Sequence, residues 1–239
     1  MASEYLKWKY RDVKPREQVE LTPAEKRKNW WYYHKWHILI GVVLATVLAS
    51  LIWQMLGIGR VYPDYQFAYV GTTALPEEAV AALEAGLASL GEDLNGDGST
   101  VVTIRQYSVY STDPTTVIAA QTQLMSDLSE CESFFFLLDD PEQFQLNYHS
   151  LARVDGSLPA EGDTSAEGTY LLWSQCPALA GLDLGRYSYS VPGEEISGDC
   201  NELVADLAVA RRGFWTDKTV SYPEGCEALW AAMTEGAAS

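Results

Sequence analysis

Residues 38–56 form an apolar run of nineteen residues without a charged side chain, ILIGVVLATVLASLIWQML. At about 1.5 Å per residue, a helix of this length covers the roughly 30 Å hydrocarbon core of a bilayer. Helices buried in soluble proteins seldom lack charges over such a length, so the run predicts a membrane span. A cleaved signal peptide is the alternative, because Val47-Leu48-Ala49 resembles a small-residue cleavage site; the 37 residues before the run are long for such a peptide.

The basic residues are distributed asymmetrically about this run. Nine of the sixteen Lys and Arg residues lie within residues 1–36, whereas the part after the run has seven basic and 28 acidic residues, a net charge of −21. The positive-inside rule therefore predicts a single-pass protein of the cell membrane with a cytoplasmic N-terminus and an extracellular C-terminal domain. The acidity argues against nucleic acid as a partner and favours cations or basic partners.

Four regions follow from these signals. Residues 1–21 mix charges without an apolar period and are predicted to be a flexible cytoplasmic segment. Thr22-Pro23-Ala24-Glu25 has a capping hydroxyl, a Pro at the first helical position and a Glu at the third, so a juxtamembrane and transmembrane helix is expected over 22–56. We expect a linker over 57–64 and one extracytoplasmic domain over 65–239.

The first half of that domain alternates between strand and helix patterns. Strands are predicted at 65–70, 101–109 and 134–138, and amphipathic helices begin at Pro76 and at Asp113-Pro114. This order, β-α-β-α-β, predicts an α/β fold with a mainly parallel sheet flanked by helices.

The second half has weaker signals. A solvated loop is expected at 156–168, a short strand at 170–173 and a closing helix at 224–233. The apolar run at 203–210 is too short to distinguish strand from helix.

All four cysteines, Cys131, Cys176, Cys200 and Cys226, follow the apolar run. An even number of cysteines in an exported domain predicts two disulfide bridges. Three connectivities are open, and we favour Cys200 with Cys226 because each precedes or opens a candidate element near the C-terminus. A metal site of these cysteines is a poorer hypothesis, since no CxxC pair exists.

Two passages of the sequence together show a family resemblance. The passage AAQTQLMSDLSECESFFFLLDDPEQF, residues 119–144, follows the sequence Asp93-Leu94-Asn95-Gly96-Asp97-Gly98 and its strand. Together they resemble one half of the extracellular solute-binding protein fold, in particular its membrane-anchored relatives in Gram-positive anaerobes of the clostridial type. The resemblance covers residues 65–144 and implies a binding or interaction domain equivalent to one lobe.

Asp93, Asn95 and Asp97, with Gly98, match positions 1, 3, 5 and 6 of a calcium-binding loop. Position 12 is Ile104, where such loops have a bidentate Glu. The alternative is a tight turn between a helix and a strand, because Asn, Asp and Gly tolerate positive φ. Calcium is thus a weak candidate cofactor, and the sequence suggests no other.

Two pairs of charged residues are candidate ligand-binding residues. Asp139 and Asp140 follow a predicted strand at its C-terminal end, where α/β sheets bind ligands, but Asp-Asp-Pro is also a common helix cap. Arg211 and Arg212 could hold a carboxylate or phosphate with aromatic neighbours, or could form ion pairs within this acidic domain.

Two function classes remain. We expect a membrane-tethered binding or interaction domain, whose partner is a small ligand or another protein, for instance as an accessory subunit of a membrane assembly. The alternative is a small exported enzyme that uses carboxylates, such as Asp139 with a partner from the loop region at 183–199. His149 is the one histidine after the apolar run and no GxSxG elbow occurs, so a serine or cysteine triad has little support.

Overall fold

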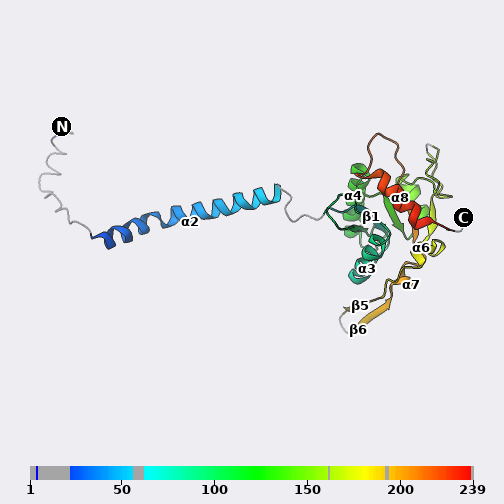
Figure 1. Cartoon of the computed structure of the whole chain (residues 1–239), viewed down its shortest axis with the longest axis horizontal. Coiled ribbons are helices and arrows are strands. Elements are labelled where there is room, and N and C mark those ends of the chain that lie inside the picture. The colour runs from blue at the N-terminus through cyan, green and yellow to red at the C-terminus, as the bar shows by residue number, and fades with distance from the viewer. Residues whose placement is uncertain (1–3, 5–21, 56–61, 161, 192–193, 238–239) are drawn as a thin grey trace. The chain divides into compact units, whose positions relative to one another are not determined.

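The structure is a computed structural model, and it describes residue 4 and residues 22–55, 62–160, 162–191 and 194–237. The chain divides into two compact units, Met1–Arg60 and Val61–Ser239. Figure 1 shows a long helix in the first unit and a layered α/β arrangement in the second.

The first unit is formed by helix α2, Pro23–Met55. A capping box begins it as predicted: the Thr22 N–H donates to the Glu25 carboxylate at 2.9 Å, and the Glu25 N–H donates to Thr22 Oγ1 at 3.4 Å. The helix continues unbroken to Met55, through residues 38–55 of the apolar run, and an eighteen-residue window of it has a mean hydropathy of 2.1. It is long and apolar enough to cross a membrane. The predicted flexible segment and most of the predicted linker lie outside the described residues.

The second unit is built on a five-stranded sheet with the order β2-β1-β3-β7-β4. Its strands are β1 (Tyr65–Val70), β2 (Val102–Tyr107), β3 (Phe135–Leu138), β4 (Tyr170–Leu172) and β7 (Ala208–Arg211). β1 pairs in parallel with β2 and β3, whereas β7 is antiparallel to both β3 and β4. The sheet is therefore mixed, and the prediction of a mainly parallel sheet is corrected. The run at 203–210 is divided between helix α7 (Cys200–Val204) and β7, which enters the sheet between β3 and β4.

Helices cover both faces of the sheet. On one face, Leu83 of α3 (Glu77–Ala88) shares a core with Phe67 and Leu137. On the other, Leu124 of α4 (Pro114–Glu130) shares a core with Ala68 and Leu138, together with α5 (Pro141–Tyr148). The predicted β-α-β-α-β order is confirmed, and its two crossover helices lie on opposite faces. The core on the α3 face also includes α6 (Pro177–Ala180), α7 and α8 (Pro223–Thr234), and a short 3-10 helix, Trp173–Gln175, follows β4.

A two-stranded hairpin, β5 (Arg186–Val191) and β6 (Glu194–Asp199), projects from the second unit beside α3 (Figure 1). It replaces the loop that we expected at 183–199, because alternating tyrosines and serines here form a strand pattern. Leu182 and Leu184 fix its base against α3, where a Cβ on Gly86 would lie only 3.1 Å from Leu184.

The two expected disulfides are absent from the structure. All four cysteines are described, and all four are free and buried. Cys176, Cys200 and Cys226 belong to the core on the α3 face, and Cys131 ends α4 in a left-handed conformation. Cys176, Cys200 and Cys226 fill small apolar positions, as buried free cysteines often do. The even number of cysteines had suggested a pairing that this packing does not contain.

Candidate functional site

The C-terminal ends of β1 and β3 lie side by side at a topological switch point. After β1 the chain leaves through α3 toward β2 at the sheet edge, and α4 then brings it back across to β3. The loops that follow β1 and β3 diverge from such a point, and open α/β sheets bind ligands in the crevice between them. Asp139, one of the predicted site residues, directly follows β3 at this place.

Hydrogen bonds hold the Asp139 carboxylate across this edge. Asp139 Oδ1 accepts from the Tyr69 hydroxyl at 3.0 Å, and Oδ2 accepts from the Thr72 N–H at 2.9 Å. A Cβ on Gly71 would lie 2.4 Å from both Asp139 Oδ2 and the Tyr69 hydroxyl, so glycine is required for this approach. Burial and the charge of Asp139 raise the pKa of Tyr69, which therefore stays a donor. The exposed carboxylate retains acceptor capacity for a ligand.

A pocket of about 560 Å³ opens at the switch point. Its polar and aromatic lining consists of Tyr69, Thr73, Glu77, Asp139, Tyr187 and Tyr189. We call it the switch-point pocket. It combines an oriented carboxylate with aromatic and apolar walls, the composition typical of small-molecule sites.

The hairpin provides one wall of the switch-point pocket. The rings of Tyr187 and Tyr189 are stacked, with centroids 6.3 Å apart and an interplanar angle of 18°. They lie on the same face of β5 because residues two apart in a strand point the same way. The Ser188 N–H between them donates to the carboxylate of Glu78 in the first turn of α3, which attaches the wall to the helix that also carries Glu77.

Asp140 is placed differently from Asp139. It is the N-cap of α5, and its Oδ1 accepts from the Gln143 N–H at 2.8 Å, with Pro141 at the first helical position. The helix-cap alternative therefore describes Asp140, whereas Asp139 lines the pocket. His149 is exposed at the C-cap of α5 and does not line the pocket.

Arg211 is buried and engaged with protein groups. Its guanidinium group forms an ion pair with Glu227 and lies 5.5 Å from the ring of Trp230. Its Nε–H donates to the Arg153 carbonyl at 3.2 Å. Of the two hypotheses for Arg211, a ligand-binding residue or an ion pair within the acidic domain, the structure contains the ion pair.

Arg212 is also buried, and it binds backbone carbonyls in place of a carboxylate. It donates to the carbonyl of Leu128, near the C-terminus of α4, and to that of Ser133. Helix C-termini leave such carbonyls unpaired and carry partial negative charge. Arg212 therefore stabilises the end of α4, and the structure places neither arginine at the switch-point pocket.

The candidate calcium loop folds as a turn whose oxygens accept from its own backbone. Asp93 accepts from the Gly96 N–H at 2.7 Å and from the Gly98 N–H at 2.8 Å, and Asn95 Oδ1 accepts from the Asp97 N–H at 2.8 Å. Gly96 and Gly98 have positive φ, as the turn alternative requires. Within the described ranges, no group of three or more His, Cys, Asp or Glu side chains is placed to hold a metal ion.

Asp64 secures this turn to the rest of the domain. Its buried carboxylate accepts from the N–H groups of Leu94, Asn95 and Val101, at 2.8, 3.0 and 2.7 Å. The linker predicted over 57–64 included Asp64, because its distant donors cannot be recognised from local sequence.

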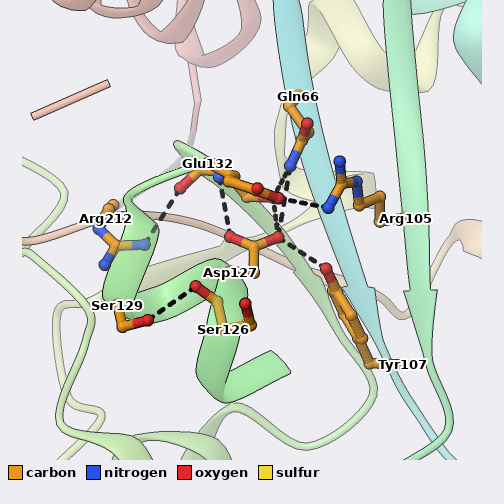
Figure 2. A network of polar contacts seen from close by, with 9 residues as sticks. Gln66, Arg105, Tyr107, Ser126, Asp127, Ser129, Glu132 and Arg212 are labelled. Atoms are coloured by element: carbon orange, nitrogen blue, oxygen red, sulfur yellow. Dashed lines mark hydrogen bonds and ion pairs between the residues drawn. The ribbon is translucent and has the colours of Figure 1, made fainter. Parts of the chain in front are cut away.

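A second buried carboxylate, Asp127, is the centre of the network in Figure 2. It accepts from the Tyr107 hydroxyl at 2.7 Å, and from the N–H and hydroxyl of Ser133 at 2.9 and 2.6 Å. Both oxygens accept hydrogen bonds and the side chain is 1 % exposed, so Asp127 joins α4 to the sheet and is shielded from solvent. An acid on the apolar stripe of a predicted helix was the signal that could have identified it.

Asp139 was predicted from the sequence, whereas the pocket walls formed by Tyr69, Glu77, Tyr187 and Tyr189 were not. The alternation of Tyr187 and Tyr189 was the available signal for one wall. Comparisons with known protein families, characterised proteins and solved structures found no match to this chain.

Proposed function

We propose that this chain is a single-pass membrane protein whose α/β domain lies outside the cytoplasm and binds a small ligand, in the manner of one lobe of a solute-binding protein. The apolar helix α2 supports the anchor, and the excess of Lys and Arg before it supports the orientation. The β-α-β-α-β order with helices on both faces is compatible with such a lobe.

The observation that carries the proposal is the switch-point pocket with Asp139 at its edge. The carboxylate is fixed by Tyr69 and Thr72 before any ligand arrives, so binding does not have to order it. The volume of about 560 Å³ is within the usual 300–1,000 Å³ of small-molecule sites.

Binding is favoured over the carboxylate-enzyme alternative by the chemistry of the lining. Among the described residues around this pocket there is no His, Cys, Ser or Lys, and its ionisable groups are Glu77, Asp139 and tyrosines. Tyr69 has a raised pKa and already donates to Asp139, so it is a poor base. The set is suited to recognition more than to nucleophilic or proton-transfer chemistry.

Native mass spectrometry of the full-length chain purified from its own membrane tests this function. We expect the wild-type chain to release a small molecule upon activation, and Asp139→Asn and Tyr189→Leu to lose most of it. Glu142→Gln, at an exposed acid in the first turn of α5, is the matched control and should retain it. If the wild-type chain carries no small molecule, or if the pocket variants retain it fully, the proposed function is wrong.

An accessory-subunit role is a second candidate, favoured by the outer face of α4. Residues 114–126 of this helix contain no charged side chain although the domain is strongly acidic. Ile118 and Met125, seven residues apart on one helix face, are 66 % and 56 % exposed. Surfaces that are depleted of charge and display large apolar side chains are typical of protein interfaces.

Site-specific photo-crosslinking in intact cells tests this second role. A crosslinking residue at Met125 should join the chain to one membrane-assembly protein, whereas the same residue at exposed Glu195 on β6 should not. Equal crosslinking at the two positions would contradict the role.

A further inference from the structure

Resting on the proposed function, we infer that the switch-point pocket takes a small organic cation, an ammonium or guanidinium compound with an apolar portion. Three features of the pocket lining support this inference: the sign of its charges, its aromatic wall and its apolar floor.

The first feature is the sign of the charges. The carboxylates of Glu77 and Asp139 line the pocket, and no Lys, Arg or His does so in the part of the chain that the structure describes. Carboxylates are acceptors alone when ionised, so a ligand that complements them must supply donors. The surrounding domain adds to the effect, because its net charge of −21 raises the local concentration of cations.

The second feature is the aromatic wall. Tyr187 and Tyr189 are stacked on the same face of β5, so their electron-rich rings are adjacent at the pocket. A cation over a tyrosine face is attracted by the negative face of the ring. The bond from Ser188 to Glu78 holds this wall near the carboxylates before binding.

The third feature is the apolar floor. Leu75, Leu203 and Leu207 line the same pocket, and Leu75 and Leu207 are nearly buried. A small, fully hydrated metal ion or ammonium ion would gain nothing from these side chains. A ligand with an apolar portion beside its charge would remove them from water.

The N-terminus of α3 lies at this pocket, and helix N-termini attract anions. Pro76 precedes α3 without a side-chain cap. However, Glu77 and Glu78 occupy the first turn and place negative charge there. An anionic ligand would have to approach these acids as well as Asp139, so the helix end does not make this pocket an anion site.

Three matched probes test the inference on the full-length chain in a neutral maltoside detergent: 2-phenylethylamine, 2-phenylethanol and phenylacetate. They share a ring and differ in charge, and calorimetry or ligand-observed NMR measures their affinities. We expect the amine to bind about tenfold more tightly than the alcohol, as the sum of cation–π and carboxylate attraction, and the acid not to bind. About 0.5 M NaCl should weaken binding of the amine and leave binding of the alcohol unchanged.

Variants locate the binding. Glu77→Gln and Tyr189→Leu should each lower the affinity for the amine about threefold to tenfold, without changing the affinity for the alcohol. Glu142→Gln and Tyr222→Leu, two partly or fully exposed positions outside the pocket, should change neither.

The two proposals can fail separately. Equal or tighter binding of the alcohol or the acid at the pocket overturns the cation inference and leaves the binding function standing. Absence of amine binding also overturns the inference, while a co-purified neutral or anionic molecule lost from Asp139→Asn would still support the function. An amine that binds equally to wild type, Glu77→Gln and Tyr189→Leu contradicts the inference as well.

Discussion

At the scale of single residues, three aspartates show how placement decides the role of a carboxylate. Asp64 and Asp127 are buried, and all their oxygens accept from backbone or hydroxyl donors. Asp139 accepts from two donors as well, but it lies exposed at a pocket. The buried pair therefore stabilises the fold, whereas Asp139 remains accessible from solvent.

Replacement of Asp64 by Ala should be strongly destabilising. Three backbone N–H groups would lose their acceptor at a position that is 4 % exposed, and each unsatisfied group costs about 1–3 kcal/mol. We expect a loss of about 3 kcal/mol or more in urea unfolding, and a smaller loss for Asp64→Asn. Asp93→Ala, in the exposed part of the same turn, is the control and should cost clearly less. Equal losses for Asp64→Ala and Asp93→Ala would contradict this role.

The cysteines should be free but protected. Burial raises the pKa of the Cys176 and Cys200 thiols and raises that of Cys226 to about 12, so few thiolates form at neutral pH. A maleimide reagent should therefore label the native chain very slowly. After denaturation without reductant, mass analysis should show four labels. Two or four labels fewer in the denatured chain would show that disulfides form after all.

At the scale of elements, α4 depends on residues distant in sequence for its C-terminal end. The helix has no basic residue in its last turn. Arg212 donates to the Leu128 carbonyl, and Lys218 Nζ donates to the Ser129 carbonyl at 2.8 Å. These cations satisfy carbonyls and complement the negative end of the helix dipole.

The two cations should differ in their contribution to stability. Arg212→Met removes a buried cation and leaves the carbonyls of Leu128 and Ser133 without donors, which should cost about 2 kcal/mol. Lys218→Met, the control of similar length, removes an exposed ion pair with Glu130 and an exposed hydrogen bond to the Ser129 carbonyl, and should cost about 0.5 kcal/mol or less. Urea unfolding of both variants measures the difference, and a larger effect of Lys218→Met would refute the assignment.

At the scale of the whole molecule, the proposed topology is open to a direct test. Protease added to intact cells should remove the α/β domain, because the excess of Lys and Arg before α2 predicts that its N-terminus stays inside. An epitope placed at residue 2 should survive the same treatment. Loss of the epitope while the domain is retained would reverse the orientation.

Stability should fall at alkaline pH. The thiol of Cys226 has an ordinary pKa of 9.0 and a folded-state pKa of about 12, and burial also raises the pKa values of Tyr69 and Tyr107. Above about pH 9 the unfolded chain loses protons that the folded domain retains, so the stabilisation present below pH 9 decreases as pH rises toward 12. Urea midpoints measured from neutral to alkaline pH should decline in this window, and the midpoint of the Cys226→Ala variant should decline less steeply. A constant midpoint would contradict the burial of these groups.

The features that could be predicted from sequence are those with local causes. The capping residues Thr22, Asp113 and Asp140 lie beside the N–H groups that they bind, and the β-α-β-α-β half has clear apolar periods. The direction of β7 and the hairpin at 186–199 were not predicted, because strand pairing joins segments that are far apart in the chain. Asp139 was predicted as a site residue because it follows a predicted strand. Tyr187 and Tyr189 were not, because they are far from Asp139 in the sequence and reach the same pocket through the folding of the domain.

The long apolar helix, the charge asymmetry about it and the α/β class follow from the sequence, since length, charge and periodicity are properties of the chain alone. By contrast, the mixed sheet, the unpaired cysteines and the role of Arg212 at the end of α4 become visible in the folded domain. The folded domain also brings a carboxylate and two stacked tyrosines into one pocket. Each of these outcomes depends on contacts between residues tens of positions apart. Such contacts form when the chain packs, and they cannot be recognised from a local stretch of sequence.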